Sequence, residues 1–156
     1  MKNILLIGGS YGIGLAIAKE IQFENNIYIA SRSNENLVDV KATYIPFDAT
    51  TDTIDTSLLP TIIDGLVYCP GSINLRPFKG IKPEAFETDL QINFISLVKV
   101  IQSVLPNLLA SEQASIVTFS SVAASMGMPF HTSVSAAKGA IEGFAKALAA
   151  EYAPKI

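Results

Sequence analysis

Short apolar runs alternate with longer stretches of helical periodicity along the chain. Five runs rich in β-branched, aromatic and leucine residues predict strands at residues 2–7, 26–31, 43–47, 65–69 and 115–120. Apolar residues at helical spacing predict helices at residues 15–21, 83–110 and 133–152. Strands separated by helices indicate a parallel sheet with right-handed crossovers. We therefore expect an α/β fold.

Prolines and polar residues modify this pattern at two places. Pro83 suits the first turn of the long helix, whereas Pro106 is expected to kink or end it because proline has no amide hydrogen. The connection after residue 48 is polar and rich in threonine, and one helical turn is expected near residues 57–63, interrupted by Pro60.

The composition predicts a single domain over residues 1–156. The chain has 156 residues, 49% of them hydrophobic, and can bury a substantial core. Its net charge of −3 argues against a nucleic-acid partner. The lone Cys69 cannot form an internal disulfide and is expected to be buried at the end of a strand, and no metal site is expected.

The apolar N-terminus superficially resembles a signal peptide, because Lys2 precedes it, but a glycine-rich turn interrupts the stretch. No uninterrupted apolar run is long enough to cross a bilayer. We expect a cytoplasmic protein without a membrane partner.

The glycine-rich turn follows the first predicted strand and has the pattern Gly8-x-x-x-Gly12-x-Gly14. Glycines let the backbone pass close to a diphosphate, while the N–H groups at the start of the next helix favour an anion. The alternative is an ordinary tight turn in which glycine only permits positive φ. The expected cofactor contacts in this turn are Gly8, Ser10, Tyr11, Gly12, Ile13 and Gly14.

The second predicted strand ends at Ser31-Arg32-Ser33, where a dinucleotide-binding fold reads the adenosine ribose. An acid there would accept hydrogen bonds from the ribose hydroxyls, whereas a guanidinium pairs with an added 2′-phosphate. The absence of an acid and the presence of Arg32 favour NADP over NAD. The alternative is an ordinary exposed arginine.

Taken together, these motifs resemble the classical short-chain dehydrogenase/reductase family over essentially the whole chain. Besides the glycines, Asp48 matches the acid after the third strand that contacts adenine, with Ala49 next to it, and Gly71 matches the last glycine of Asn-Asn-Ala-Gly. The resemblance implies a Rossmann-type doubly wound parallel sheet of strand order 3-2-1-4-5. It also implies that the chain stops before the family's sixth and seventh strands, as a fragment or a shortened homologue.

The resemblance also assigns the catalytic residues. Asn93, Ser121 and Lys138 match the family's helix asparagine, its serine and the lysine of Tyr-x-x-x-Lys, and Lys138 is also expected to bind the nicotinamide ribose. Val134 stands where the family has its proton-donating tyrosine. Because Ser121 and Lys138 keep the family separation, a shifted register does not explain the valine.

Another group must then supply the proton. His131, the only histidine, lies three residues before Val134, and its ordinary pKa suits proton transfer near neutrality. The alternative is that a water molecule supplies the proton and that His131 is an ordinary surface residue. Ser133 and Ser135 rank below His131 because unassisted hydroxyls are poor acids.

Several of these residues have simpler interpretations. Lys138 can be an exposed helix lysine, Asn93 a tolerated polar residue and Ser121 a helix cap. Met126, Met128 and Phe130 occupy a segment that forms one wall of the family's substrate pocket, or they fill the core.

Three functions follow from the sequence. The first is an NADP-dependent oxidoreductase acting on a small carbonyl or alcohol, and the second is a noncatalytic NADP-binding sensor or assembly protein. The third is a structural fragment that associates without binding a nucleotide. The long helices at residues 83–110 and 133–152 resemble those through which family members dimerise, so a homo-oligomer is expected.

Overall fold

The computed structural model describes all residues, 1–156, and contains one five-stranded parallel sheet. The strand order is β3-β2-β1-β4-β5, which confirms the predicted topology. The strands are β1 (Lys2–Ile7), β2 (Asn25–Ser31), β3 (Ala42–Pro46), β4 (Gly65–Tyr68) and β5 (Ser115–Thr118). Central β1 aligns Leu5 with Tyr28 of β2 and with Leu66 of β4.

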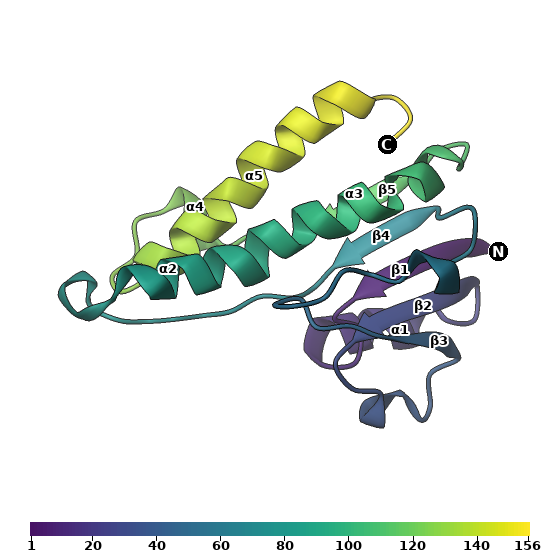
Figure 1. Ribbon diagram of the computed structural model, residues 1–156, viewed down its shortest axis with the longest axis horizontal. Helices are drawn as coiled ribbons and strands as arrows, with labels where there is room; N and C mark the ends of the chain where they lie inside the picture. The colour runs from purple at the N-terminus through teal and green to yellow at the C-terminus, as the bar shows by residue number, and fades with distance from the viewer.

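Helices cover both faces of this sheet (Figure 1). They are α1 (Gly12–Ile21), α2 (Pro83–Leu90), a π-helical turn η4 (Gln91–Ile95), α3 (Ser96–Leu109), α4 (Val122–Ser125) and α5 (Thr132–Tyr152). Three short 3-10 turns lie in connections, η1 (Glu35–Leu37), η2 (Thr56–Leu58) and η3 (Phe78–Gly80).

The strand alternation divides the core into two layers. In β1, Leu5 and Ile7 belong to the larger buried cluster with residues of α3 and α5, whereas Leu6 belongs to a smaller cluster with Ala18 of α1. Successive side chains of a strand point to opposite faces, so one strand contributes to both layers. The expected doubly wound architecture is therefore present.

The tract α2-η4-α3 is one nearly continuous helical stretch that extends beyond the sheet (Figure 1). By length and composition, Pro83–Leu109 is apolar enough to cross a membrane, which the sequence interpretation did not anticipate. Core helices of soluble proteins pass the same test. Here Leu97, Val100, Val104 and Leu108 are buried in the larger core cluster.

Three local expectations differ from the structure in their bounds. Pro106 does not end the long helix, because it lies in the last turn and Ala110 N–H still reaches Pro106 O at 3.1 Å. The turn expected near residues 57–63 is instead the 3-10 turn Thr56–Leu58, which Asp55 caps by accepting from Ser57 N–H. Strand β5 stops at Thr118, and the short helix α4 follows it.

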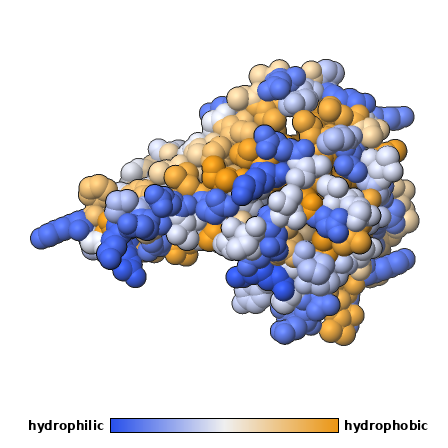
Figure 2. Space-filling model, viewed as in Figure 1, coloured by the Kyte–Doolittle hydropathy of each residue, from blue (hydrophilic) through white to orange (hydrophobic).

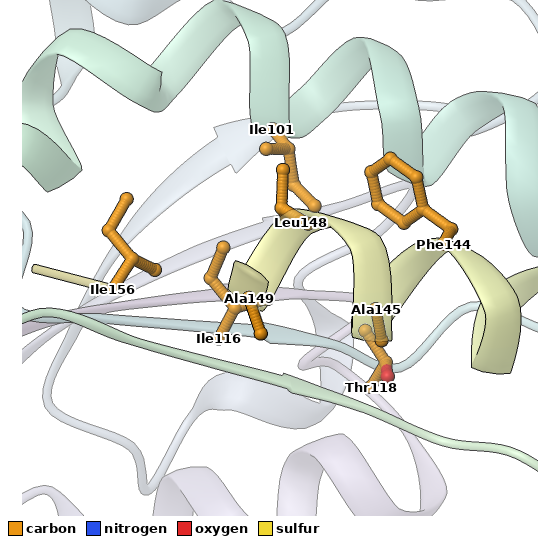
Figure 3. A pocket seen from close by; sticks show the side chains of 8 residues that line it. All are labelled: Ile101, Ile116, Thr118, Phe144, Ala145, Leu148, Ala149 and Ile156. Atoms are coloured by element: carbon orange, nitrogen blue, oxygen red, sulfur yellow. The ribbon is translucent and has the colours of Figure 1, made fainter. Parts of the chain in front are cut away.

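An apolar hollow of about 70 Å³ lies between α3, β5, α5 and the C-terminal residue (Figure 3). Ile101, Ile116, Phe144 and Leu148 line it together with Ile156. The side chains converge on the same space from elements far apart in sequence (Figure 3). Hydrophobic surface also remains visible over the part of the molecule where α3 and α5 lie (Figure 2).

Candidate functional site

An open groove of about 510 Å³ lies at the carboxyl ends of β1 to β4. This is the edge of a doubly wound sheet where ligands bind. Seven of the residues expected to bind a cofactor line the groove: Gly8, Ser10, Tyr11, Arg32, Asp48, Ala49 and Gly71.

The glycine turn between β1 and α1 forms one end of the groove. Gly8 and Gly12 have positive φ angles of 75° and 55°, which residues with side chains rarely adopt. A Cβ on Gly14 would lie 2.4 Å from Gly8 O, so only glycine fits there. No side chain caps the first turn of α1. The turn thus fits a diphosphate held by main-chain N–H groups.

Gly12, Ile13 and Gly14 do not line the groove themselves. The Ile13 side chain is exposed, so any contribution to binding comes from its backbone in the first turn of α1. Asn36, which sequence reasoning missed, lines the groove and donates from Nδ2 to Ser10 O at 3.2 Å. Nothing in its local pattern distinguishes it from other loop asparagines.

Arg32 and Asp48 lie on the part of the groove beyond β2 and β3. Arg32 is exposed at the end of β2. The Asp48 carboxylate accepts from Thr50 Oγ1 at 2.7 Å and from Thr50 N–H at 2.8 Å. The Thr50 hydroxyl contributes most to lowering the Asp48 pKa, followed by the Thr50 N–H, while the positive charge of Arg32 contributes least. The Asp48 carboxylate is therefore held in place by Thr50, whereas the Arg32 guanidinium is exposed and available to a ligand.

Cys69 also lines the groove and is half-buried, and it packs against the smaller core cluster, so the expected core position is met only in part. Burial still raises the pKa of this thiol to about 11. The thiol is consequently protonated at neutral pH, and a nucleophilic role is not indicated.

Lys138 is buried, not the exposed lysine of the simpler interpretation, and is 8% exposed. Its Nζ donates to Phe119 O at 2.9 Å, at the end of β5, and burial lowers the pKa of the ammonium. A Cβ on Gly71 would lie 3.4 Å from Lys138 Nζ and 3.2 Å from Asn93 Oδ1. The fold thus brings Lys138 and Asn93 together beside Gly71, at the inner end of the groove.

Asn93 is held inside the helical tract by the π turn η4. Ser96 N–H bonds to Gln91 O, five residues back, and not to Ile92 O, four residues back, as a regular α-helix would require. Ile92 O accepts instead from the Tyr68 hydroxyl at 2.6 Å. Burial raises the pKa of Tyr68 to about 12, so this hydroxyl is a permanent donor.

The π turn is also anchored to α5. Phe94 packs edge-to-face on Phe144, with ring centroids 5.6 Å apart. Because α5 carries Lys138, this contact joins the elements that hold the two predicted catalytic residues.

The two positions that match the family's serine and tyrosine, Ser121 and Val134, cannot together transfer a proton to a substrate. Ser121 caps α4, because its Oγ accepts from Ala123 N–H at 3.2 Å, as the simpler interpretation expected. Val134 is buried in α5 one turn before Lys138 and carries no group that can transfer a proton. Ser133 is also buried, and its hydroxyl lacks a hydrogen-bond partner.

His131 lies immediately before α5 and is only partly buried. Its Nδ1 lies 2.6 Å from Pro129 O, and since a carbonyl only accepts, Nδ1 carries the proton. The Nε2 atom is left for exchange with a ligand or solvent. No hydrogen bond joins His131 to Asn93, Ser121 or Lys138.

Met126, Met128 and Phe130 are all exposed between α4 and α5, so they do not fill the core. Phe130 has a positive φ of 68°, and its carbonyl accepts from Arg76 N–H at 3.2 Å. This bond joins the loop before α5 to the loop after β4.

The sheet order, the glycine turn and the groove define a protein of Rossmann-like architecture with a groove suited to a nucleotide. The sequence profile of the family described as short chain dehydrogenase matches residues 2–156. The chain therefore belongs to the short-chain dehydrogenase/reductase family. Its curated relatives are named as reductases and dehydrogenases, which supports an oxidoreductase of this type.

Curated relatives include a 3-oxoacyl-(acyl-carrier-protein) reductase of Buchnera aphidicola, 28% identical over 99% of this chain and 69% of that protein. A hydroxysteroid 11-beta-dehydrogenase 1-like protein of Xenopus laevis is 32% identical over 97% of this chain and 58% of its own length. A Shigella flexneri short chain dehydrogenase complexed with NADP has a TM-score of 0.89 at 24% identity, covering 99% of this chain and 73% of that one. The chain thus spans 69% and 58% of the lengths of these two curated relatives.

Proposed function

We propose that the protein transfers hydride between NADP(H) and a small carbonyl or alcohol compound. The observation that carries this proposal is the convergence of Lys138 Nζ and Asn93 Oδ1 at Gly71, at the inner end of a groove whose other end is the glycine turn. The glycine turn at α1 would hold the diphosphate of a dinucleotide in that groove, and Lys138 would hold its nicotinamide end.

The choice of NADP rests on Arg32. Arg32 in the segment after β2 lines the groove, and no acid of that segment does. A guanidinium binds a phosphate through paired, charge-assisted hydrogen bonds. The solved Shigella flexneri relative with NADP and an actinorhodin polyketide ketoreductase with NADPH support a nicotinamide cofactor of this kind.

In this proposal the chain's own residues bind and orient the cofactor and the substrate. When bound, the nicotinamide supplies the hydride. The Lys138 ammonium would hold the ribose, the Ser121 hydroxyl would polarise the substrate oxygen, and the exposed Met126 and Phe130 would contact an apolar substrate. The proton would come from Nε2 of the doubly protonated His131 imidazolium or from water, because Val134 has none to give.

The names of the relatives support a carbonyl or alcohol substrate without defining which. One is a 3-oxoacyl reductase, another a cyclopentanol dehydrogenase and a third a hydroxysteroid dehydrogenase-like protein. We further propose that the protein acts in the cytoplasm and self-associates through the outer faces of α3 and α5.

Titration with NADPH followed by carbonyl-dependent NADPH oxidation tests the function. We expect saturable binding and slow turnover by the native protein, and turnover by Val134→Tyr faster by about a hundred- to ten-thousand-fold, the usual contribution of a positioned acid. Val134→Phe, which adds the ring without the hydroxyl, is the control.

Two results would contradict the proposal in different ways. Absence of NADPH binding would reject a nucleotide-dependent function altogether. Binding without turnover over a broad carbonyl panel, together with turnover by Val134→Tyr only, would identify a cofactor-binding protein that is not catalytic.

A further inference from the structure

A buried carboxylate lies next to the candidate site and has no role in the function described above. Asp89, at the end of α2, is 3% exposed. Its Oδ1 accepts from Ser72 Oγ at 2.5 Å, while its Oδ2 is buried without a hydrogen-bond partner. Burying a carboxylate with an unpaired oxygen is unfavourable, so a function is the natural explanation for its presence.

The direction of each hydrogen bond in this cluster follows from which groups can donate a proton. A carboxylate only accepts, so the single proton of the Ser72 hydroxyl is committed to Asp89. Ser72 Oγ must therefore accept from its other neighbour, which is Asn93 Nδ2 at 2.8 Å. The second N–H of Asn93 donates to Asp89 O, also at 2.8 Å.

Both N–H groups of the Asn93 amide are thereby used within the cluster, and the amide oxygen must point the other way. Asn93 Oδ1 is buried and without a partner, and it lies 3.2 Å from the position that a Gly71 Cβ would take. Lys138 Nζ lies 3.4 Å from the same position. The amide thus presents an acceptor to the space that the Lys138 ammonium also faces.

We propose that Asp89 and Ser72 are positioning residues that fix the orientation of the Asn93 amide, so that an acceptor and not a donor faces Lys138 at the nicotinamide end of the groove. The consequence for cofactor binding rests on the proposed function; the orientation itself does not. Without the Ser72 hydroxyl only the bond to the Asp89 main-chain O holds the amide, so it rotates more readily and presents its NH₂ group to the ammonium. A donor would then face a donor, and the lysine would be displaced or less readily charged.

The spacing in sequence supports a dedicated arrangement. Asp89 precedes Asn93 by four residues across the start of the π turn, so the two lie on adjacent turns, and Ser72 directly follows Gly71. The cluster therefore joins the segment that forms the groove wall to the helix that carries Asn93.

Ser72→Ala, Ser72→Thr and Asp89→Ala test this proposal in the full chain. Ser72→Ala removes the hydroxyl, Ser72→Thr retains it, and Asp89→Ala frees the hydroxyl to donate to Asn93. Ser103→Ala is the matched control, because Ser103 Oγ also makes one hydrogen bond, to Lys99 O, but on α3 away from the site.

The first readout is the side-chain amide of Asn93 in nuclear magnetic resonance spectra without nucleotide. We expect slowly exchanging N–H₂ protons in the native protein and in Ser72→Thr, and faster exchange in Ser72→Ala and Asp89→Ala. The second readout is the NADPH dissociation constant, which we expect to rise by about fivefold in Ser72→Ala and Asp89→Ala, the effect of losing one oriented hydrogen bond.

A further readout separates positioning from structural support. Asp89→Ala removes a buried, incompletely paired carboxylate, so its melting temperature should not fall below that of the native protein even though its NADPH affinity falls. Equal loss of amide protection in Ser72→Thr and Ser72→Ala would overturn the proposal, as would native-like protection in both Ser72→Ala and Asp89→Ala. If the native protein binds no NADPH, the proposed function fails, whereas the amide spectra still decide the orientation.

Discussion

The burial of Lys138 has a direct consequence for the pH dependence of cofactor binding. Burial lowers the pKa of its ammonium, because the charged form loses solvation. If the ammonium binds the nicotinamide ribose, the NADPH affinity is complete below that pKa and declines as the pH rises through it. We expect the midpoint of the decline to lie below pH 10.5, the ordinary pKa of a lysine.

Isothermal titration calorimetry between about pH 7 and about pH 10 measures this decline. Lys138→Arg is the control, because a guanidinium stays charged throughout and its affinity should not change with pH in this range. A native affinity that is constant to the top of the range, with circular dichroism showing a folded protein, would contradict a binding role for the Lys138 ammonium.

Arg32 decides between the two nicotinamide cofactors in the proposed function. Arg32→Ala should weaken NADPH binding by about tenfold, since a charge-assisted bond to the 2′-phosphate is lost, and should leave NADH binding nearly unchanged. Competition titrations with the two nucleotides measure the ratio. Lys41→Ala, which removes another exposed cation that does not line the groove, is the control. Equal weakening of both nucleotides by Arg32→Ala would argue against recognition of the 2′-phosphate.

At the scale of elements, the β1–α1 unit depends on glycine for a steric reason. A Cβ at Gly14 would lie 2.4 Å from Gly8 O, a backbone atom that cannot move without opening the turn. Gly14→Ala should therefore lower the melting temperature and abolish saturable NADPH binding. The calorimetric melt and a fluorescence titration measure the two effects.

Gly143→Ala is the matched control for this change. Gly143 lies within α5, and a Cβ there would meet no atom within 4 Å. Alanine is the better helix former by about 1 kcal/mol, so Gly143→Ala should raise the melting temperature. A Gly14→Ala protein as stable as the native one would show that the close approach of Gly14 to Gly8 is not needed.

The elements differ in how far the sequence predicts them. The strand runs and the glycine turn are local patterns, and they predicted β1, α1, β4 and the groove residues around Gly8. The π turn is not a local pattern, because it depends on the Tyr68 hydroxyl, which comes from a strand 24 residues away and takes the carbonyl that the turn releases. The position of Asp89, four residues before Asn93 in the predicted helix, was a visible signal that the sequence interpretation did not use.

The predicted site residues also differ in this respect. Family spacing located Lys138 and Asn93, and the fold brings both to Gly71. Spacing did not indicate that Lys138 is buried or that Ser121 caps α4, because both depend on how α4 and α5 meet the end of β5. The role of His131 stays a prediction, since its one hydrogen bond is within its own loop.

At the scale of the whole molecule, the site depends on helical elements, η4 and α5, that extend beyond the sheet. The strands end toward the part of the molecule that contains α2 and α4, while both chain termini lie at the opposite end (Figure 1). Lys138 and Asn93 do not line the groove themselves but approach Gly71, which does, from α5 and η4, two elements that pack against each other. Alternating strands and helices made this arrangement predictable, since parallel strands present all their carboxyl ends to one edge.

Self-association is the remaining property of the whole molecule, and α5 offers a surface suited to it. Its outer face carries the small exposed residues Ala136, Gly139, Gly143 and Ala147, which permit close approach of a second helix. Ala147→Glu places a charge on that face without touching the groove and should convert an oligomer into monomers at micromolar concentration. Phe23→Glu is the control, because Phe23 is a large exposed apolar residue just after α1, which covers the other face of the sheet. Sedimentation velocity measures the outcome, and a native protein that is monomeric, or an oligomer that persists in Ala147→Glu, would contradict association through α5.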